Sequence, residues 1–130
     1  MIVKMKMTKL NALLKLLGFY NYIQPNASNV LTPSEMELLA VFCTLPEKYR
    51  HSMFSIQGKK KATGIYQEIF GKTLSGVNLN NKIYCLLDKG FLHRDEDKVI
   101  YIKPFLLSSI NKMNEDNKIQ LGVDIDVEDS

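Results

Sequence analysis

Side chains that can read the edges of nucleic-acid bases gather in one short stretch of this chain. Asparagine can hydrogen-bond adenine with both ends of its amide, and lysine suits guanine or phosphate. The polar residues of the stretch are Asn78, Asn80, Asn81, Lys82 and Tyr84. Asparagine is a poor helix former, so three of them within four residues favour a functional reason for their presence. The alternative is an ordinary polar surface in a protein rich in asparagine.

Positively charged side chains accompany this stretch. Between Lys48 and Lys82 the seven lysines and arginines are offset by a single acid, Glu68. Four of the fourteen acids of the chain lie in its last seven residues, so the rest carries seventeen basic against ten acidic side chains. The excess of positive charge outside the last seven residues suits a polyanionic partner. The other explanation of this excess is solubility alone. The residues that we expect to contact phosphate are Lys59, Lys60, Lys61 and Lys72.

Patterns typical of catalysis or metal binding are weak. The two histidines, His51 and His93, lie on different segments, and neither is near a cysteine in the sequence. The run from Gly71 to Thr73 resembles the end of a phosphate-binding loop, but Tyr66 stands where that loop needs its first glycine. We therefore expect no enzyme, with no catalytic residue, no metal site and no cofactor.

The cysteines and the hydropathy pattern indicate a compartment. The chain has two cysteines, Cys43 and Cys85, and a secreted domain stabilised by disulfides carries many more. We therefore expect reduced thiols. No apolar run approaches the roughly 18 residues of a membrane-spanning helix. The excess of lysine over arginine is typical of an AT-rich genome, such as that of a bacterium or its phage. The sequence predicts a cytoplasmic protein, in the host cytoplasm or the virion if a phage encodes it.

The first half of the chain predicts a strand and two helices. Residues 2–7 alternate apolar and basic side chains, as a short edge strand or extended arm does. A helix with leucines at 10, 13, 14 and 17 follows, and Gly18 is placed to end it. After a loop at 21–30, a capping box and a proline at the first helical position begin a second helix. Its residues are Thr32, Pro33 and Glu35 at the start, Met36, Leu39, Ala40 and Cys43 on the buried face, and Pro46 at the end.

The second half predicts two helices, a hairpin and a further helix. A short helix runs from about residue 62 to Phe70, ends at Gly71 and is preceded by the three lysines at 59–61. Ser75 caps a longer helix that ends at Gly90. A β-hairpin follows, and a last helix spans 105 to about 112. The buried face of the longer helix consists of Leu79, Ile83, Leu86 and Leu87, and the hairpin of Phe91-Leu92, a charged turn and residues 99–102.

The order of these elements over residues 32–104 resembles a winged helix-turn-helix domain. The most specific match is Leu86-Leu87-Asp88-Lys89-Gly90-Phe91-Leu92, because recognition helices of that family commonly close with Leu-x-x-Lys-Gly and an apolar pair. The resemblance implies a mainly α fold with a small β-hairpin, of the α+β class. It also implies DNA contacts from the longer helix, phosphate contacts from 59–61 and a wing contact from Arg94. Two departures are the long turn at 71–75 and Lys82, where many relatives carry an apolar residue.

The function that this resemblance implies is a non-enzymatic protein that binds double-stranded DNA. It would be a small transcription or replication regulator of a bacterium or phage. The alternative is a winged helix used as a protein-interaction or structural module, within a phage particle or a larger assembly. The wing favours the alternative, because Arg94 and Lys98 are outnumbered by the three acids at 95–97.

We expect three parts: an arm and amphipathic helix at 1–31, the winged-helix domain at 32–113, and an acidic tail at 114–130. The helix of the first part is expected to pack on its own domain, with a homodimer contact and a membrane-surface helix as alternatives. The tail is expected to be solvated or bound to a protein partner. Apolar residues alternate with polar ones between Ile119 and Val127, so strand addition to a partner is a rival interpretation.

Overall fold

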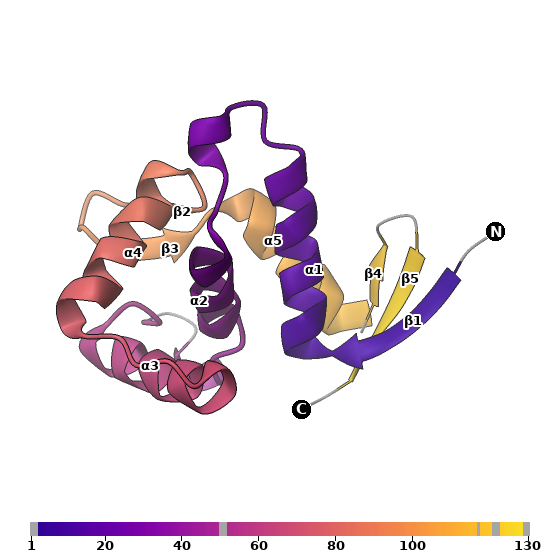
Figure 1. Ribbon diagram of the computed structural model, residues 1–130, viewed down its shortest axis with the longest axis horizontal. Helices are drawn as coiled ribbons and strands as arrows, with labels where there is room; N and C mark the ends of the chain where they lie inside the picture. Colours follow the sequence, from indigo (N-terminus) through magenta and orange to yellow (C-terminus); the bar gives the residue numbers. More distant parts are fainter. Residues whose placement is uncertain (1–2, 50–51, 117, 121–122, 129–130) are drawn as a thin grey trace.

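The computed structural model describes residues 3–49, 52–116, 118–120 and 123–128 (Figure 1). These residues form a mainly helical protein with two small sheets, which confirms the α+β class and the antiparallel hairpin. None of the described helices is long and apolar enough to cross a membrane. The elements in chain order are β1 (Val3–Thr8), α1 (Lys9–Tyr22), η1 (Ala27–Asn29), α2 (Pro33–Cys43), η2 (Glu47–Tyr49), α3 (Ile56–Phe70), α4 (Gly76–Asp88), β2 (Leu92–Arg94), β3 (Ile100–Ile102), α5 (Pro104–Asp116), β4 (Lys118–Gln120) and β5 (Val123–Glu128).

Helix α2 is the centre of the core. The predicted capping box is present, because Thr32 Oγ1 accepts a hydrogen bond from Glu35 N and the Glu35 carboxylate accepts one from Thr32 N. The predicted buried face was too narrow: all residues from Leu38 to Cys43 are buried, and Met36 is only half-buried. The helix is surrounded because α1 lies on one side of it and α3 and α4 on the other (Figure 1). A helix packed from several directions needs apolar residues all round, not a single stripe.

Helix α1 packs on its own chain and is longer than predicted. Its buried residues are Ala12, Leu13, Leu16 and Leu17, as the leucine spacing indicated. The prediction that Gly18 ends the helix was wrong, since α1 continues to Tyr22. The last turn is fixed by Asn21, whose Nδ2 donates to Leu31 O at 3.1 Å while its Oδ1 accepts from Leu31 N at 2.6 Å. This pairing with a distant backbone offsets the cost of a glycine inside the helix.

Helix α3 begins earlier than predicted. Ser55 caps it, with its Oγ accepting a hydrogen bond from Gly58 N at 3.2 Å, and the helix then runs from Ile56 to Phe70. The lysines at 59–61 therefore lie within its first two turns and do not precede it. The sequence hides this start because Gly58 interrupts the helical pattern. Gly71 ends the helix as predicted, with a left-handed φ of 67°.

Helix α4 and the hairpin follow the prediction closely. Ser75 caps the helix through a hydrogen bond from Asn78 N, and Leu79, Ile83 and Leu86 are buried, whereas Leu87 is half-buried. Gly90 has a φ of 85°, a left-handed conformation that reverses the chain at little cost only for glycine. Strands β2 and β3 then pair antiparallel, and Phe91 beneath them is fully buried.

The end of the chain, expected as a solvated or partner-bound tail, contains regular elements that pack within the same chain. Helix α5 extends to Asp116, and β4 and β5 join β1 in a three-stranded sheet ordered β1-β5-β4. Strand β5 runs parallel to β1, and the register places Lys4 opposite Asp124 and Lys6 opposite Asp126. The alternation between Ile119 and Val127 thus belongs to strands that pair within the same chain, where strand addition to a partner was the rival interpretation. Figure 1 shows this sheet beside α1, at the end of the molecule away from α4.

Candidate nucleic-acid interface

Helix α4 turns one side toward solvent. Opposite its buried leucines and isoleucine lies a line of exposed residues, which we call the outer ridge of α4. Val77 is 71% exposed and Tyr84 53%, so large apolar surface lies open here. Lys82, which the sequence analysis counted among the residues that could read bases, is half-buried at the flank of the helix. The outer ridge consists of Val77, Asn81, Tyr84, Cys85 and Asp88.

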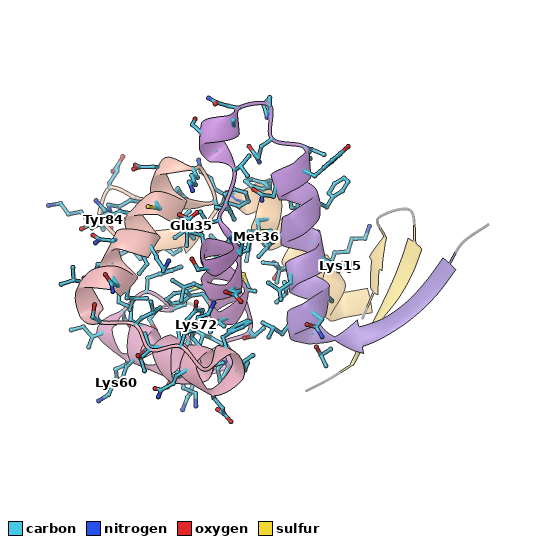
Figure 2. All side chains as sticks on the ribbon, viewed as in Figure 1. Lys15, Glu35, Met36, Lys60, Lys72 and Tyr84 are labelled. Atoms are coloured by element: carbon cyan, nitrogen blue, oxygen red, sulfur yellow. The ribbon has the colours of Figure 1, made fainter. Side chains whose placement is uncertain are left out.

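The first lysine of α3 is joined to α4. Lys59 Nζ donates a hydrogen bond to Asn80 Oδ1 at 3.1 Å, which brings two predicted site residues from different helices together. Lys60 and Lys61 are exposed, and Figure 2 shows Lys60 at the outer edge of α3. The Lys59 ammonium group is therefore held beside α4, and the exposed Lys60 and Lys61 follow it in α3.

The hairpin is also joined to α4. The Arg94 guanidinium lies over the Tyr84 ring, 5.7 Å from its centroid, a cation–π contact. On the hairpin itself, His93 and Tyr101 are cross-strand partners whose rings lie 5.6 Å apart. Tyr84 thus links the hairpin to the outer ridge of α4.

Two predicted site residues face α2 instead. Lys82 Nζ donates to Ser34 Oγ at 2.8 Å, and Lys72 pairs with Glu37 at 3.3 Å. Figure 2 shows Lys72 between α3 and α2, whereas Tyr84 lies at the outer edge of the molecule. Asn78 is exposed at the start of α4. The structure therefore brings together Lys59, Asn80, Tyr84 and Arg94 around α4 but directs Lys72 and Lys82 to the first turn and a half of α2.

A buried ion pair that sequence reasoning missed holds the end of α4. Lys89 Nζ donates to the Glu35 carboxylate, and Glu35 is only 4% exposed. Burial alone would raise the pKa of Glu35, but hydrogen bonds from Lys89 and Thr32 outweigh it and hold the pKa below its ordinary value. The capping box identified Glu35 as a backbone partner, but no local pattern links it to a lysine fifty-four residues away.

We predict that Glu35→Gln lowers the free energy of unfolding by about 2 kcal/mol at neutral pH, because Lys89 loses its charged partner. A lowered folded-state pKa gives stability that is complete above the ordinary value near 4.5 and is lost as the pH falls through the folded value. Denaturant unfolding should thus show the two proteins converging in acid. The control Glu37→Gln breaks a pair whose lysine is 56% exposed, and should cost less than about 1 kcal/mol.

Within the part of the chain that the structure describes, the cysteines lie apart and differ in exposure. Burial raises the pKa of the Cys43 thiol to about 12, so it stays protonated, while Cys85 is exposed on the outer ridge of α4. Among the described residues, no three histidine, cysteine or acidic side chains gather where they could hold a metal ion. His51 lies outside the described residues.

Comparison with known proteins adds no relative. No protein-family model, no curated protein and no solved structure matches this chain. The class that fold and site define is a mainly helical α+β protein whose helix α4 carries polar and aromatic side chains outward between a lysine of α3 and an arginine of the hairpin.

Proposed function

We propose that this is a non-enzymatic winged helix-turn-helix protein that binds double-stranded DNA through α4. In this proposal α2, α3 and α4 are the helical core, β2 and β3 are the wing, and α4 enters the major groove. The protein would act in the cytoplasm as a small transcription or replication regulator of a bacterium or phage.

The observation that carries the proposal is the convergence of three elements on the exposed side of α4. Lys59 reaches α4 from α3 through Asn80, and Arg94 reaches it from the hairpin through Tyr84. Both cations thus lie at the border of a surface of amide and aromatic groups. Phosphate contacts that flank base contacts are the usual division of labour in a DNA interface.

The second candidate function is a protein-interaction or structural module. The turn of the hairpin carries Asp95, Glu96 and Asp97, and Asp88 lies at the end of the outer ridge. These carboxylates would repel a phosphate backbone near the wing. A shallow groove on α1 offers a surface for a protein partner or for the homodimer that was the alternative role of this helix. The groove is lined by Asn11, Leu14, Lys15, Gly18 and Phe19.

The test is binding to duplex DNA over a series of salt concentrations. Replacing Lys59, Lys60 and Lys61 together by alanine should weaken binding to all duplexes alike and reduce the slope of log K against log salt by about 0.9 per lost phosphate contact. Replacing Asn78 and Asn81 by alanine should instead cost about 1–3 kcal/mol per lost base contact, at the preferred sequence only.

Lys15→Ala is the matched control, because Lys15 lies on α1, on the side away from α4 (Figure 2). This variant should bind as the parent does. If no duplex binds even at low salt, or if neither set of variants changes binding, the DNA proposal is wrong. Thiol-directed crosslinking through the exposed Cys85 would then identify the protein that contacts the outer ridge.

A further inference from the structure

Val77 has an exposure that the fold does not explain. It lies in the first turn of α4, is 71% exposed, and contributes nothing to the core. Asn81 follows it four residues later, so the two side chains are neighbours on the outer ridge. An apolar group beside an amide is thus presented at the start of the helix, where recognition helices reach base edges.

The lysine of α4 and the lysine that follows the end of this helix are both bound to α2. Lys82 donates to Ser34, and Lys89 donates to Glu35, so both lysines of the 76–89 segment are bound to α2. Arginine and lysine are the usual partners of guanine in the major groove. The first two turns of the outer ridge therefore lack the side chains that best select G·C pairs.

The side chain of Asn80 already has a hydrogen-bond partner. Its Oδ1 already accepts a hydrogen bond from Lys59, and adenine recognition by asparagine requires the oxygen and the nitrogen together. Asn81 is exposed on the ridge itself, next to Val77. The amide best placed to bind adenine is therefore the one that stands beside an apolar side chain.

We infer that α4 selects A·T base pairs, with Asn81 bound to adenine and Val77 in contact with the 5-methyl group of thymine. The inference rests on the proposed function, because it specifies what that same interface reads. The methyl group is the one apolar feature that the major groove presents, and contact with it distinguishes thymine from every other base. Val77 would be a specificity-determining residue of the interface.

The experiment uses the full chain and a duplex that it selects from a random pool. The selected duplex is then synthesised with thymine and with uracil, which lacks only the methyl group. The parent protein should bind the uracil duplex about fourfold more weakly, as expected for one methyl group removed from water. Val77→Ala should bind both duplexes equally, whereas Val99→Ala, which truncates an exposed valine of the hairpin, should keep the difference.

Both variants alter exposed side chains, and matching melting temperatures verify that they are folded. Asn81→Ala is a second variant, and it should lose the preference for A·T over G·C pairs in the selected sequence. A G·C-rich selected sequence, or equal binding of thymine and uracil duplexes by the parent, overturns this inference and leaves the DNA proposal standing. Failure to bind any duplex overturns both.

Discussion

Replacing Ile83 by aspartate is expected to unfold the protein. Ile83 is 2% exposed and lies between Leu79 and Leu86 on the buried side of α4. An aspartate there would bury a charge with no partner, and such a change exceeds the stability of many small domains. We expect a loss of more than about 5 kcal/mol, measured as the absence of a cooperative melting transition.

The matched control for Ile83→Asp is Asn81→Asp, which places the same charge on the outer ridge of the same helix. Asn81 is exposed, so this variant should melt within a few degrees of the parent and change stability by less than about 0.5 kcal/mol. A cooperative transition near the parent temperature for Ile83→Asp would show that α4 does not bury this side.

Local signals explain why α4 could be predicted from the sequence. A cap, an apolar stripe and a terminal glycine are all properties of a few neighbouring residues, and they agree at Ser75, Ile83 and Gly90. The same holds for the capping box of α2. Where several local preferences point to one structure, tertiary packing has little to override.

Long-range contacts explain what could not be predicted. The direction of Lys82 depends on where Ser34 lies, and the two are forty-eight residues apart. The pairing of β5 with β1 joins opposite ends of the chain, so the alternation at 119–127 indicated a strand without indicating its partner. The candidate site shares this limit: the asparagines were found from composition and spacing, but the hydrogen bond between Lys59 and Asn80 became visible only in the fold.

Gly58 shows how one residue can hide a helix start. It lies in the first turn of α3, and it is buried against the chain that precedes the helix. A Cβ atom at this position would collide with the backbone oxygen of Met53 and lie 2.6 Å from Met53 C and 2.7 Å from Ser52 O. In the sequence this glycine interrupts the helical pattern. In the structure it allows the backbone of α3 to lie close to the backbone of residues 52–53.

Gly58→Ala is therefore expected to destabilise the protein by more than about 3 kcal/mol, because the atoms in the way belong to backbone and the first turn of α3 must move. Gly64→Ala in the same helix is the matched control. Nothing lies within 4 Å of a Cβ atom there, so alanine should stabilise the protein by about 0.5–1 kcal/mol through its higher helix propensity. Thermal and denaturant unfolding of both variants decide the question. If the two alanines have the same effect, the turn at 52–55 does not pack against the first turn of α3. The position from which Lys59 reaches Asn80 would then be wrong as well.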